Sequence, residues 1–238
     1  LFSMDRFVYL LFRAACRAIS LMPIPAVYRL GAALGALAHW VLVPYRRLAV
    51  ANMTLAFGEE KTPREIRRLA REHFARMGAN FLCSIKLSQM AKEEMLRHIE
   101  VEGLEWVGQI TAEGKGSVFI AGHLGNWEAL AQMAPLMFPS KTGTVYQRLG
   151  NRHIDAYIRR TRSRLGTKVF ERKSGLFAAS QLVREGGSVA VLIDQHAGDS
   201  GVWTPFFGRL ASTSPLAATL AVHTGAPLSR ASVYTVRP

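Results

Sequence analysis

The sequence has little cysteine and lacks several common catalytic motifs, and these absences narrow the classes of protein that it can encode. Its two cysteines, Cys16 and Cys83, provide no disulfide framework, which suits a domain that faces the cytosol. No histidine–cysteine cluster has the spacing of zinc ligands, and no phosphate-binding Gly-x4-Gly-Lys-Ser/Thr loop occurs. A Gly-x-Ser-x-Gly elbow is also missing, which argues against a covalent serine route. We therefore expect neither a metal ion nor a cofactor.

Acidic residues are few relative to basic ones. With 30 Lys and Arg against 17 Asp and Glu, the 238-residue chain carries a formal charge of +13, which favours anionic partners. Nucleic acid, an anionic membrane surface and an acidic carrier protein all fit this charge. A hydrophobic content of 49% favours the membrane, since soluble nucleic-acid binders are usually more polar, so we expect no nucleic acid. The length predicts one main domain with an N-terminal appendage.

Apolar segments at the start of the chain predict a helical membrane anchor over residues 1–45. Phe2–Leu21 has the pattern of an interfacial amphipathic helix, with arginines spaced along one face. Ile24–Val43 is apolar over about the length that spans a bilayer, but it contains an arginine and a histidine. Spanning the membrane and lying on its surface both remain open.

The rest of the chain, residues 46–238, is expected to form an α/β domain in the cytoplasm. Arg46 and Arg47 follow the apolar run, and basic residues favour the cytoplasmic side. A capping box from Thr62 to Glu65 predicts the start of a helix. The final segment, Ala231–Pro238, ends within an expected strand, so we expect the C-terminus to be truncated.

From Ser117 onward, strand and helix patterns alternate, which predicts a mostly parallel central sheet flanked by helices. The expected strands are Val118–Ala121, Gly143–Tyr146, Lys168–Phe170 and Ser188–Asp194. The expected helices are Asn126–Met137, Arg152–Leu165, Gly175–Arg184 and Thr213–Thr224.

A histidine and a carboxylate follow the first of these strands. His123 and Glu128 come after a β-branched run that ends at Gly122. On a regular helix, residues five apart point about 140° away from each other, so these two cannot meet there. They can meet if His123 lies on a turn and Asn126 caps a helix whose first turn carries Glu128. A carboxylate on one ring nitrogen would leave the other nitrogen as a base.

This segment, Gly122-His123-Leu-Gly-Asn126-Trp127-Glu128, resembles the active-site block of the bacterial lipid A biosynthesis acyltransferases, the late lauroyl/myristoyl transferases. These belong to the wider glycerolipid acyltransferase superfamily with its His-x4-Asp/Glu motif. The resemblance extends from about Arg46 to the end of the chain. Its further blocks begin at Tyr146, Arg162, Phe170, Asp194 and Pro205.

The resemblance implies an acyltransferase that moves a fatty acyl chain from a thioester to a hydroxyl, with His123 and Glu128 as the catalytic pair. Backbone N–H groups at the helix start, or Arg172, would stabilise the oxyanion. Asp194, at a strand end, would orient an arginine or the acceptor, or form a structural salt bridge. The expected substrate-binding residues are Asn126, Arg148, Arg162, Arg164, Arg172, Asp194 and Gln195; the arginines suit an acceptor with phosphates.

The expected partners are acyl carrier protein or acyl-CoA as donor, an anionic lipid A precursor as acceptor, and the bacterial inner membrane. Three alternatives remain at this stage. In the first, the acceptor is another glycolipid or lysophospholipid, such as a phosphatidylinositol mannoside. In the second, the chain is a non-catalytic basic membrane-binding protein. In the third, it is a metal-dependent hydrolase with four metal ligands, His123, Glu128, Asp194 and His196.

Overall fold

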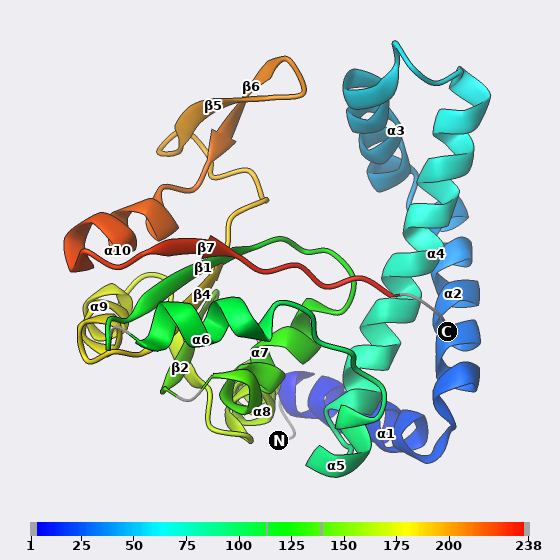
Figure 1. Ribbon diagram of the computed structural model, residues 1–238. Helices are drawn as coiled ribbons and strands as arrows, with labels where there is room; N and C mark the ends of the chain where they lie inside the picture. The colour runs from blue at the N-terminus through cyan, green and yellow to red at the C-terminus, as the bar shows by residue number, and fades with distance from the viewer. Residues whose placement is uncertain (1–3, 113, 139, 236–238) are drawn as a thin grey trace.

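The computed structural model describes residues 4–112, 114–138 and 140–235. Its centre is a five-stranded, all-parallel sheet with the strand order β3-β2-β4-β1-β7 (Figure 1). The strands are β1 (Ser117–Ala121), β2 (Thr142–Tyr146), β3 (Lys168–Glu171), β4 (Ser188–Leu192) and β7 (Leu228–Arg230). This confirms the predicted α/β class and its parallel central sheet.

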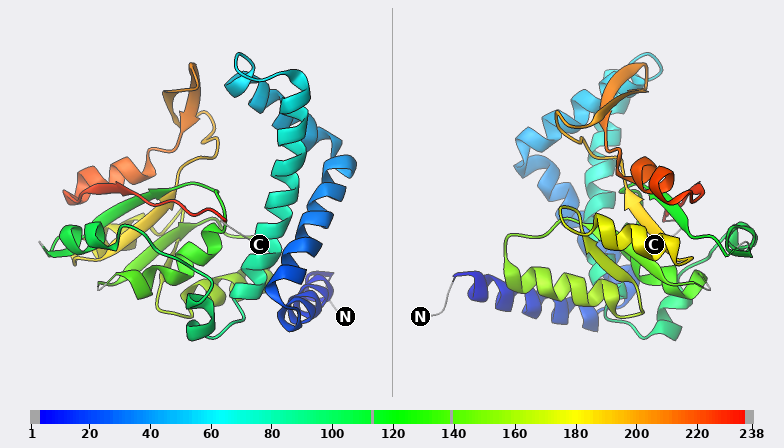
Figure 2. Two further views of the ribbon diagram at one scale, coloured as in Figure 1. Left: turned by 45° about the vertical axis from the view of Figure 1, so that its right-hand side comes forward. Right: turned by 90° about the vertical axis from the view of Figure 1, so that its left-hand side faces the viewer.

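Helices cover both faces of the sheet (Figures 1 and 2). One face carries α6 (Leu104–Ala112), α7 (Trp127–Met137) and α8 (Arg152–Ser163), whereas the other carries α9 (Leu176–Arg184) and α10 (Leu216–Thr224). Since each parallel connection needs a crossover, the helices necessarily lie on the faces and bury the strands between them.

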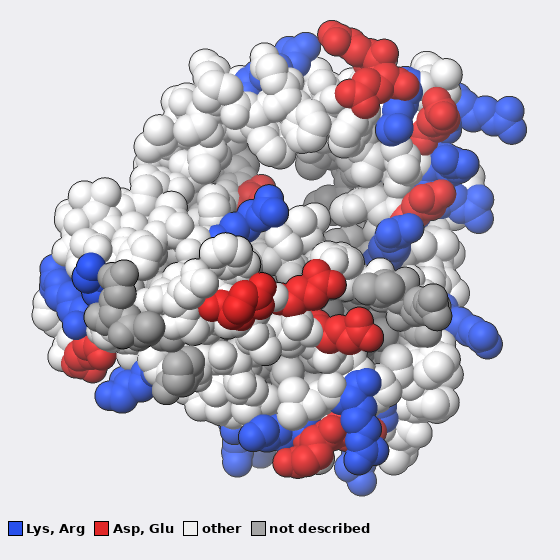
Figure 3. Space-filling view, viewed as in Figure 1, with Lys and Arg blue, Asp and Glu red and all other residues white. Residues whose placement is uncertain are grey.

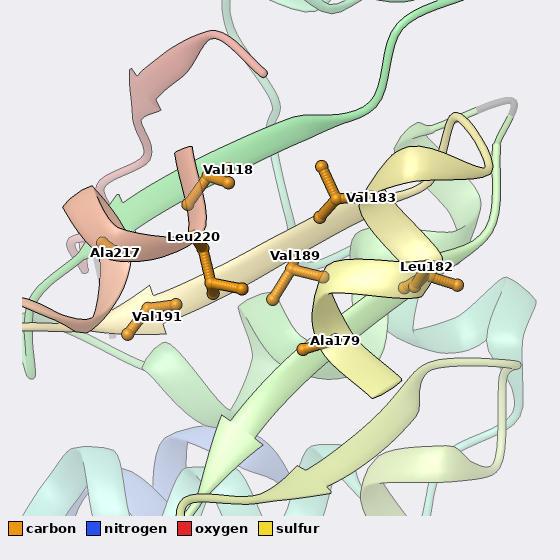
Figure 4. Packing of buried hydrophobic residues seen from close by; sticks show 8 residues of the cluster. All are labelled: Val118, Ala179, Leu182, Val183, Val189, Val191, Ala217 and Leu220. Carbon is orange, nitrogen blue, oxygen red and sulfur yellow. The ribbon is translucent and has the colours of Figure 1, made fainter. Parts of the chain in front are cut away.

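The core under α9 and α10 is built from aliphatic side chains (Figure 4). Val118, Val189 and Val191 point from the strands toward Leu182 on α9 and Leu220 on α10, and all five are at most 2% exposed. Complete burial of each such side chain is worth about 1.5–3 kcal/mol. This packing holds β1 beside β4, the two strands that lead into the site.

A bundle of N-terminal helices stands beside the α/β part (Figures 1 and 2). Its longest helix, α4 (Pro63–Leu87), begins at the predicted capping box: the Thr62 N–H donates to the Glu65 carboxylate at 2.8 Å, and the Glu65 N–H donates to the Thr62 hydroxyl at 3.3 Å. The short helix α5 (Lys92–Leu96) follows.

The predicted apolar anchor forms three helices: α1 (Met4–Leu21), α2 (Ile24–Val41) and α3 (Val43–Phe57). The expected continuous segment Ile24–Val43 stops at Leu42, where the chain bends by 94° into α3. Of the helices in the described ranges, none alone is both long and apolar enough to cross a bilayer, although α2 and α3 together meet that length and composition. The expected boundary at residue 45 therefore falls within α3.

Close contact with α4 ties α2 to the rest of the fold. Gly31 and Gly35 on α2 face Gly78 on α4, and a Cβ atom built on Gly35 would lie only 2.1 Å from the Phe74 carbonyl oxygen. Glycine is required here because the two helix backbones approach too closely for a side chain.

A two-stranded hairpin, β5 (Val202–Phe206) and β6 (Arg209–Thr213), projects from the α/β part toward α3 (Figure 1). The sequence patterns did not predict it. Thr213, expected to start a helix, ends β6 instead, and α10 begins at Leu216 after Pro215. The expected strand from Ser188 ends at Leu192, and residues 231–235 form no strand; residues 236–238 lie outside the described part.

Candidate active site

The register of the sheet brings His123 and Asp194 together. Strands β1 and β4 are parallel neighbours, paired from Ser117↔Ser188 to Ala121↔Leu192. His123 follows β1 by two residues and Asp194 follows β4 by two, so the same offset continues past the strand ends. The carboxyl ends of parallel strands form one edge of the sheet, where open α/β folds place their sites.

Two hydrogen bonds join these residues. The His123 ring nitrogen Nδ1 lies 2.7 Å from Asp194 Oδ1, and the His123 backbone N–H donates to Asp194 Oδ2 at 2.6 Å. Gly122 makes room for the carboxylate, since a Cβ atom there would lie 3.1 Å from Asp194 Oδ2. An Nδ1–H that donates to Asp194 leaves Nε2 as the free basic nitrogen.

Opposing effects act on the acidity of Asp194. Burial raises the pKa of this carboxyl, but the hydrogen bonds from His123 outweigh burial and hold the pKa below its ordinary value. Asp194 is therefore ionised at neutral pH and stabilises positive charge on the imidazole.

The structure corrects the expected pairing of His123 with Glu128. Both Glu128 oxygens accept hydrogen bonds from Arg162: Nε donates to Oε2 at 2.8 Å, and Nη2 donates to Oε1. This bidentate pair is largely buried, with 23% of the Glu128 side chain and 19% of the Arg162 side chain exposed. Glu128 lies in the first turn of α7, as predicted, but the carboxylate that holds the imidazole belongs to Asp194, two residues after the neighbouring strand β4.

His123, Glu128 and Arg162 all line a cleft of about 240 Å³ at this edge of the sheet. Arg172, which follows β3, and Gln195, which follows β4, line it too, as do Trp127, Tyr146 and His196. The Trp127 ring stands edge-on to His123 with centroids 5.1 Å apart. Tyr146 and Trp127 were not identified as site residues, although both occur in the sequence blocks that surround the motif.

Besides Asp194, whose carboxylate binds His123, three predicted substrate-binding residues do not line this cleft. Asn126 is buried and acts as the α7 cap, because its side-chain oxygen accepts from the Ala129 N–H at 3.2 Å and from the Ser84 hydroxyl at 2.7 Å. Arg148 is exposed on the loop after β2.

Arg164 instead braces the helices. Its guanidinium donates to the Met90 carbonyl at 2.6 Å, the Leu87 carbonyl at 3.2 Å and Gln132 Oε1 at 3.1 Å. Burial lowers the pKa of this arginine. Its donors are engaged by the protein itself, so Arg164 supports the helices, and its expected role in substrate binding stays a prediction.

Within the described ranges, no three His, Cys, Asp or Glu side chains are grouped to hold a metal ion. Asp194 and Glu128, two of the ligands in the hydrolase alternative, are engaged by His123 and Arg162.

Comparison with protein families identifies the chain. The model of the bacterial lipid A biosynthesis acyltransferases matches residues 3–234. The chain belongs to this family. It is therefore an acyltransferase of lipid A biosynthesis, and enzymes of this pathway are membrane-associated. A search of curated proteins gives no match.

The acyltransferase has a second, apolar pocket of about 470 Å³ between α6, α7 and the sheet. Most of its lining is apolar, including Trp106, Ile110, Phe119, Ala134 and Met137. Ala131 and Thr144 line both this pocket and the cleft that contains His123. Its volume lies within the range of about 300–1,000 Å³ that is typical of small-molecule sites. Phe119 lies on the opposite face of β1 from Val118, so this pocket and the aliphatic core lie on opposite faces of the sheet.

Proposed function

We propose that this enzyme transfers a fatty acyl chain from the thioester of acyl carrier protein to a hydroxyl of a lipid A precursor, without a covalent enzyme intermediate. The observation that carries this proposal is the imidazole held on Asp194 in a polar cleft that shares wall residues with an apolar pocket. The proposed setting is the cytoplasmic face of the bacterial inner membrane.

His123 is the proposed general base. Its Nε2 takes the proton of the acceptor hydroxyl as the hydroxyl oxygen attacks the thioester carbonyl carbon. When the tetrahedral intermediate collapses, the carbon–sulfur bond breaks and the imidazolium returns the proton to the thiolate, which leaves as a thiol. Asp194 keeps Nδ1 protonated and stabilises the imidazolium between these steps.

The oxyanion of that intermediate requires a hydrogen-bond donor. Arg162 uses Nε and Nη2 for Glu128, and its Nη1 has no hydrogen-bond partner within the described residues. We assign Glu128 the task of holding Arg162 at the cleft, so that this guanidinium is oriented before substrate arrives. Arg172, exposed at the rim, suits the phosphates of the acceptor or the acidic carrier.

The apolar pocket suits the acyl chain of the donor. An alkyl chain in this pocket, with its thioester near Ala131 and Thr144, would place the carbonyl in the cleft that His123 lines. Transfer of such a chain from water into an apolar pocket is favourable by about 0.8 kcal/mol per buried CH₂ group.

The test is mass spectrometry of the lipid products after incubation with acyl carrier protein or acyl-CoA thioesters and candidate acceptors. His123→Ala is expected to lower kcat by about two to four orders of magnitude, because a general base contributes about that much. Asp194→Asn is expected to lower it within the same range, since the amide has a single oxygen in place of the two that bind His123.

Asp199→Asn is the matched control, because Asp199 is an exposed acid in the loop after β4 and does not line the cleft. A folded Asp194→Asn enzyme with the kcat of the control would show that Asp194 does not orient the base. If Glu128→Gln alone removed activity while Asp194→Asn did not, the originally expected His123–Glu128 pair would be restored.

A further inference from the structure

The β5–β6 hairpin exposes an unusual amount of apolar surface. Val202, Trp203, Phe206, Phe207 and Leu210 are each between 51% and 66% exposed, within nine consecutive residues. In Figure 3 the surface over this hairpin is mostly uncharged apart from basic atoms, and the hairpin contains the exposed Arg209, whereas charged side chains of both signs gather at the neighbouring end of α3 and α4.

Apolar side chains lie on both faces of this hairpin. Along β5, Val202 and Phe206 point to one face and Trp203 to the other, while Leu210 on β6 lies opposite Pro205 on the Trp203 face. A protein partner docked on one face would leave the other in water. A lipid environment surrounds the hairpin and covers both faces together.

The turn of the hairpin holds a strained aromatic residue. Phe207 and Gly208 have φ angles of 48° and 70°, and Phe206 pairs with Arg209, so this is a two-residue turn with positive φ at both central positions. Phe207 is the one non-glycine residue with positive φ in the described ranges, and bulky residues rarely adopt it. Asparagine suits this backbone conformation far better, so the turn geometry does not account for an exposed phenylalanine there.

The base of the hairpin, in contrast, is firmly built. Ser212 is buried and donates to the Gly198 carbonyl at 2.5 Å, and the hydroxyls of Thr204 and Thr213 lie 2.6 Å apart. The tip is thus presented on a fixed support.

The hairpin adjoins the helices proposed to contact the membrane. Phe207 stands edge-on to Phe57, the last residue of α3, with ring centroids 5.2 Å apart. Tyr45 and Leu48 on α3 are 65% and 57% exposed, and Arg47 beside them is exposed and basic. Aromatic and basic residues together are typical of the interface of an anionic bilayer.

We propose that the β5–β6 hairpin is a second membrane-binding element, which inserts Trp203, Phe206, Phe207 and Leu210 among the headgroups and outer acyl segments of an anionic bilayer, next to α3. This extends the proposed membrane association and does not depend on the chemistry assigned to His123. It would fix the cleft against the membrane from the α/β side, whereas α1–α3 contact the membrane from the other side.

The test is flotation of the full chain with vesicles of phosphatidylethanolamine and phosphatidylglycerol. Phe207→Asn is expected to lower the partition coefficient about tenfold, since burial of a phenylalanine side chain accounts for at least that factor. Phe177→Asn on α9 is the matched control: Phe177 is 77% exposed, far from the hairpin, and its loss should leave partitioning unchanged. Vesicles of phosphatidylcholine alone should bind all variants more weakly.

Two further measurements test whether Phe207→Asn still folds. Asparagine accepts positive φ, and this relief of strain offsets the lost ring contact with Phe57, so Phe207→Asn should unfold near the wild-type temperature. Its activity on detergent-dispersed substrates should remain at the wild-type level, since Phe207 does not line the cleft.

Quenching by brominated lipids gives a second readout. Wild-type fluorescence should be quenched more by brominated than by unbrominated vesicles, and Trp203→Phe should remove part of that difference.

Equal partitioning of Phe207→Asn and wild type would overturn the proposal, and so would an equal loss in Phe177→Asn. Wild-type partitioning combined with weaker binding of acyl carrier protein would assign the hairpin to the carrier instead. Wild-type partitioning with lost activity in detergent would mean that the hairpin contacts the substrate and not the membrane.

Discussion

At the scale of single residues, the carboxylates of the site have separate tasks. Asp194 holds the His123 ring and its backbone N–H, and Glu128 binds Arg162. His123, Glu128 and Arg162 line one cleft, so a loss of activity on removal of either carboxylate would arise through different groups. Both losses should appear in kcat, because the base and the oxyanion donor both act in the transition state.

The exposed arginines differ in where they lie relative to the cleft, and this gives a prediction. Arg172→Ala is expected to raise the apparent KM for acceptor or donor by about one to two orders of magnitude, since charge-assisted contacts contribute about 1.5–3 kcal/mol. Arg148→Ala is its matched control, as Arg148 is exposed but lies outside the cleft. Steady-state kinetics with both substrates varied, at low and high salt, would show whether Arg172 contributes to substrate binding. Unchanged KM in both variants would leave Arg172 as an ordinary surface charge.

At the scale of elements, α7 serves both sites. Its first turn presents Trp127 and Glu128 to the cleft, and its later turns present Ala134 and Met137 to the apolar pocket. The Asn126 cap, supported by Ser84 of α4, fixes where this helix begins. A shift of α7 would therefore change the cleft and the pocket together.

Acyl-chain selectivity should respond to a larger side chain on α7. Ala134→Phe is expected to shift the preferred donor to a shorter chain, because the ring would fill part of the apolar pocket. Competition between thioesters of different chain length, with products resolved by mass, measures this. Ala178→Phe, on the exposed side of α9, provides the control. Identical product distributions in both variants would place the acyl chain elsewhere.

At the scale of the whole molecule, the N-terminal helices are an integral part of the fold. The glycine contacts join α2 to α4, and α1 reaches α8, where Phe12 meets Tyr157 edge-on at 5.4 Å. Removal of residues 1–44 would expose the packed face of α4, so the shortened protein is not a clean test of membrane anchoring.

Gly35→Ala tests this integration with a smaller change. The added methyl would clash with the Phe74 carbonyl, and forced overpacking costs about 1–3 kcal/mol. We expect the melting temperature in detergent to fall by several degrees, about 2–4 °C for each kcal/mol. Gly150→Ala, where an added Cβ meets no atom within 4 Å, should leave it nearly unchanged. A stable Gly35→Ala protein would mean that α2 and α4 can separate at little cost.

Much of the local structure could be predicted from the sequence. The capping box at Thr62, the strand that ends before Gly122 and the Asn126 cap are determined by residues close in the chain, so their side-chain chemistry alone specifies them. The alternation of strands and helices likewise predicted the parallel sheet, and with it the edge at which His123 and Asp194 both lie.

What only the tertiary structure decided is which distant residues meet. The pairing offset of β1 and β4, fixed by core packing across both strands, placed Asp194 on His123 and left Glu128 for Arg162. The same holds for Arg164, whose partners Leu87 and Met90 are more than 70 residues away. Composition can show that such side chains require partners, but the choice depends on the free energy of the whole packed chain, which no local pattern contains.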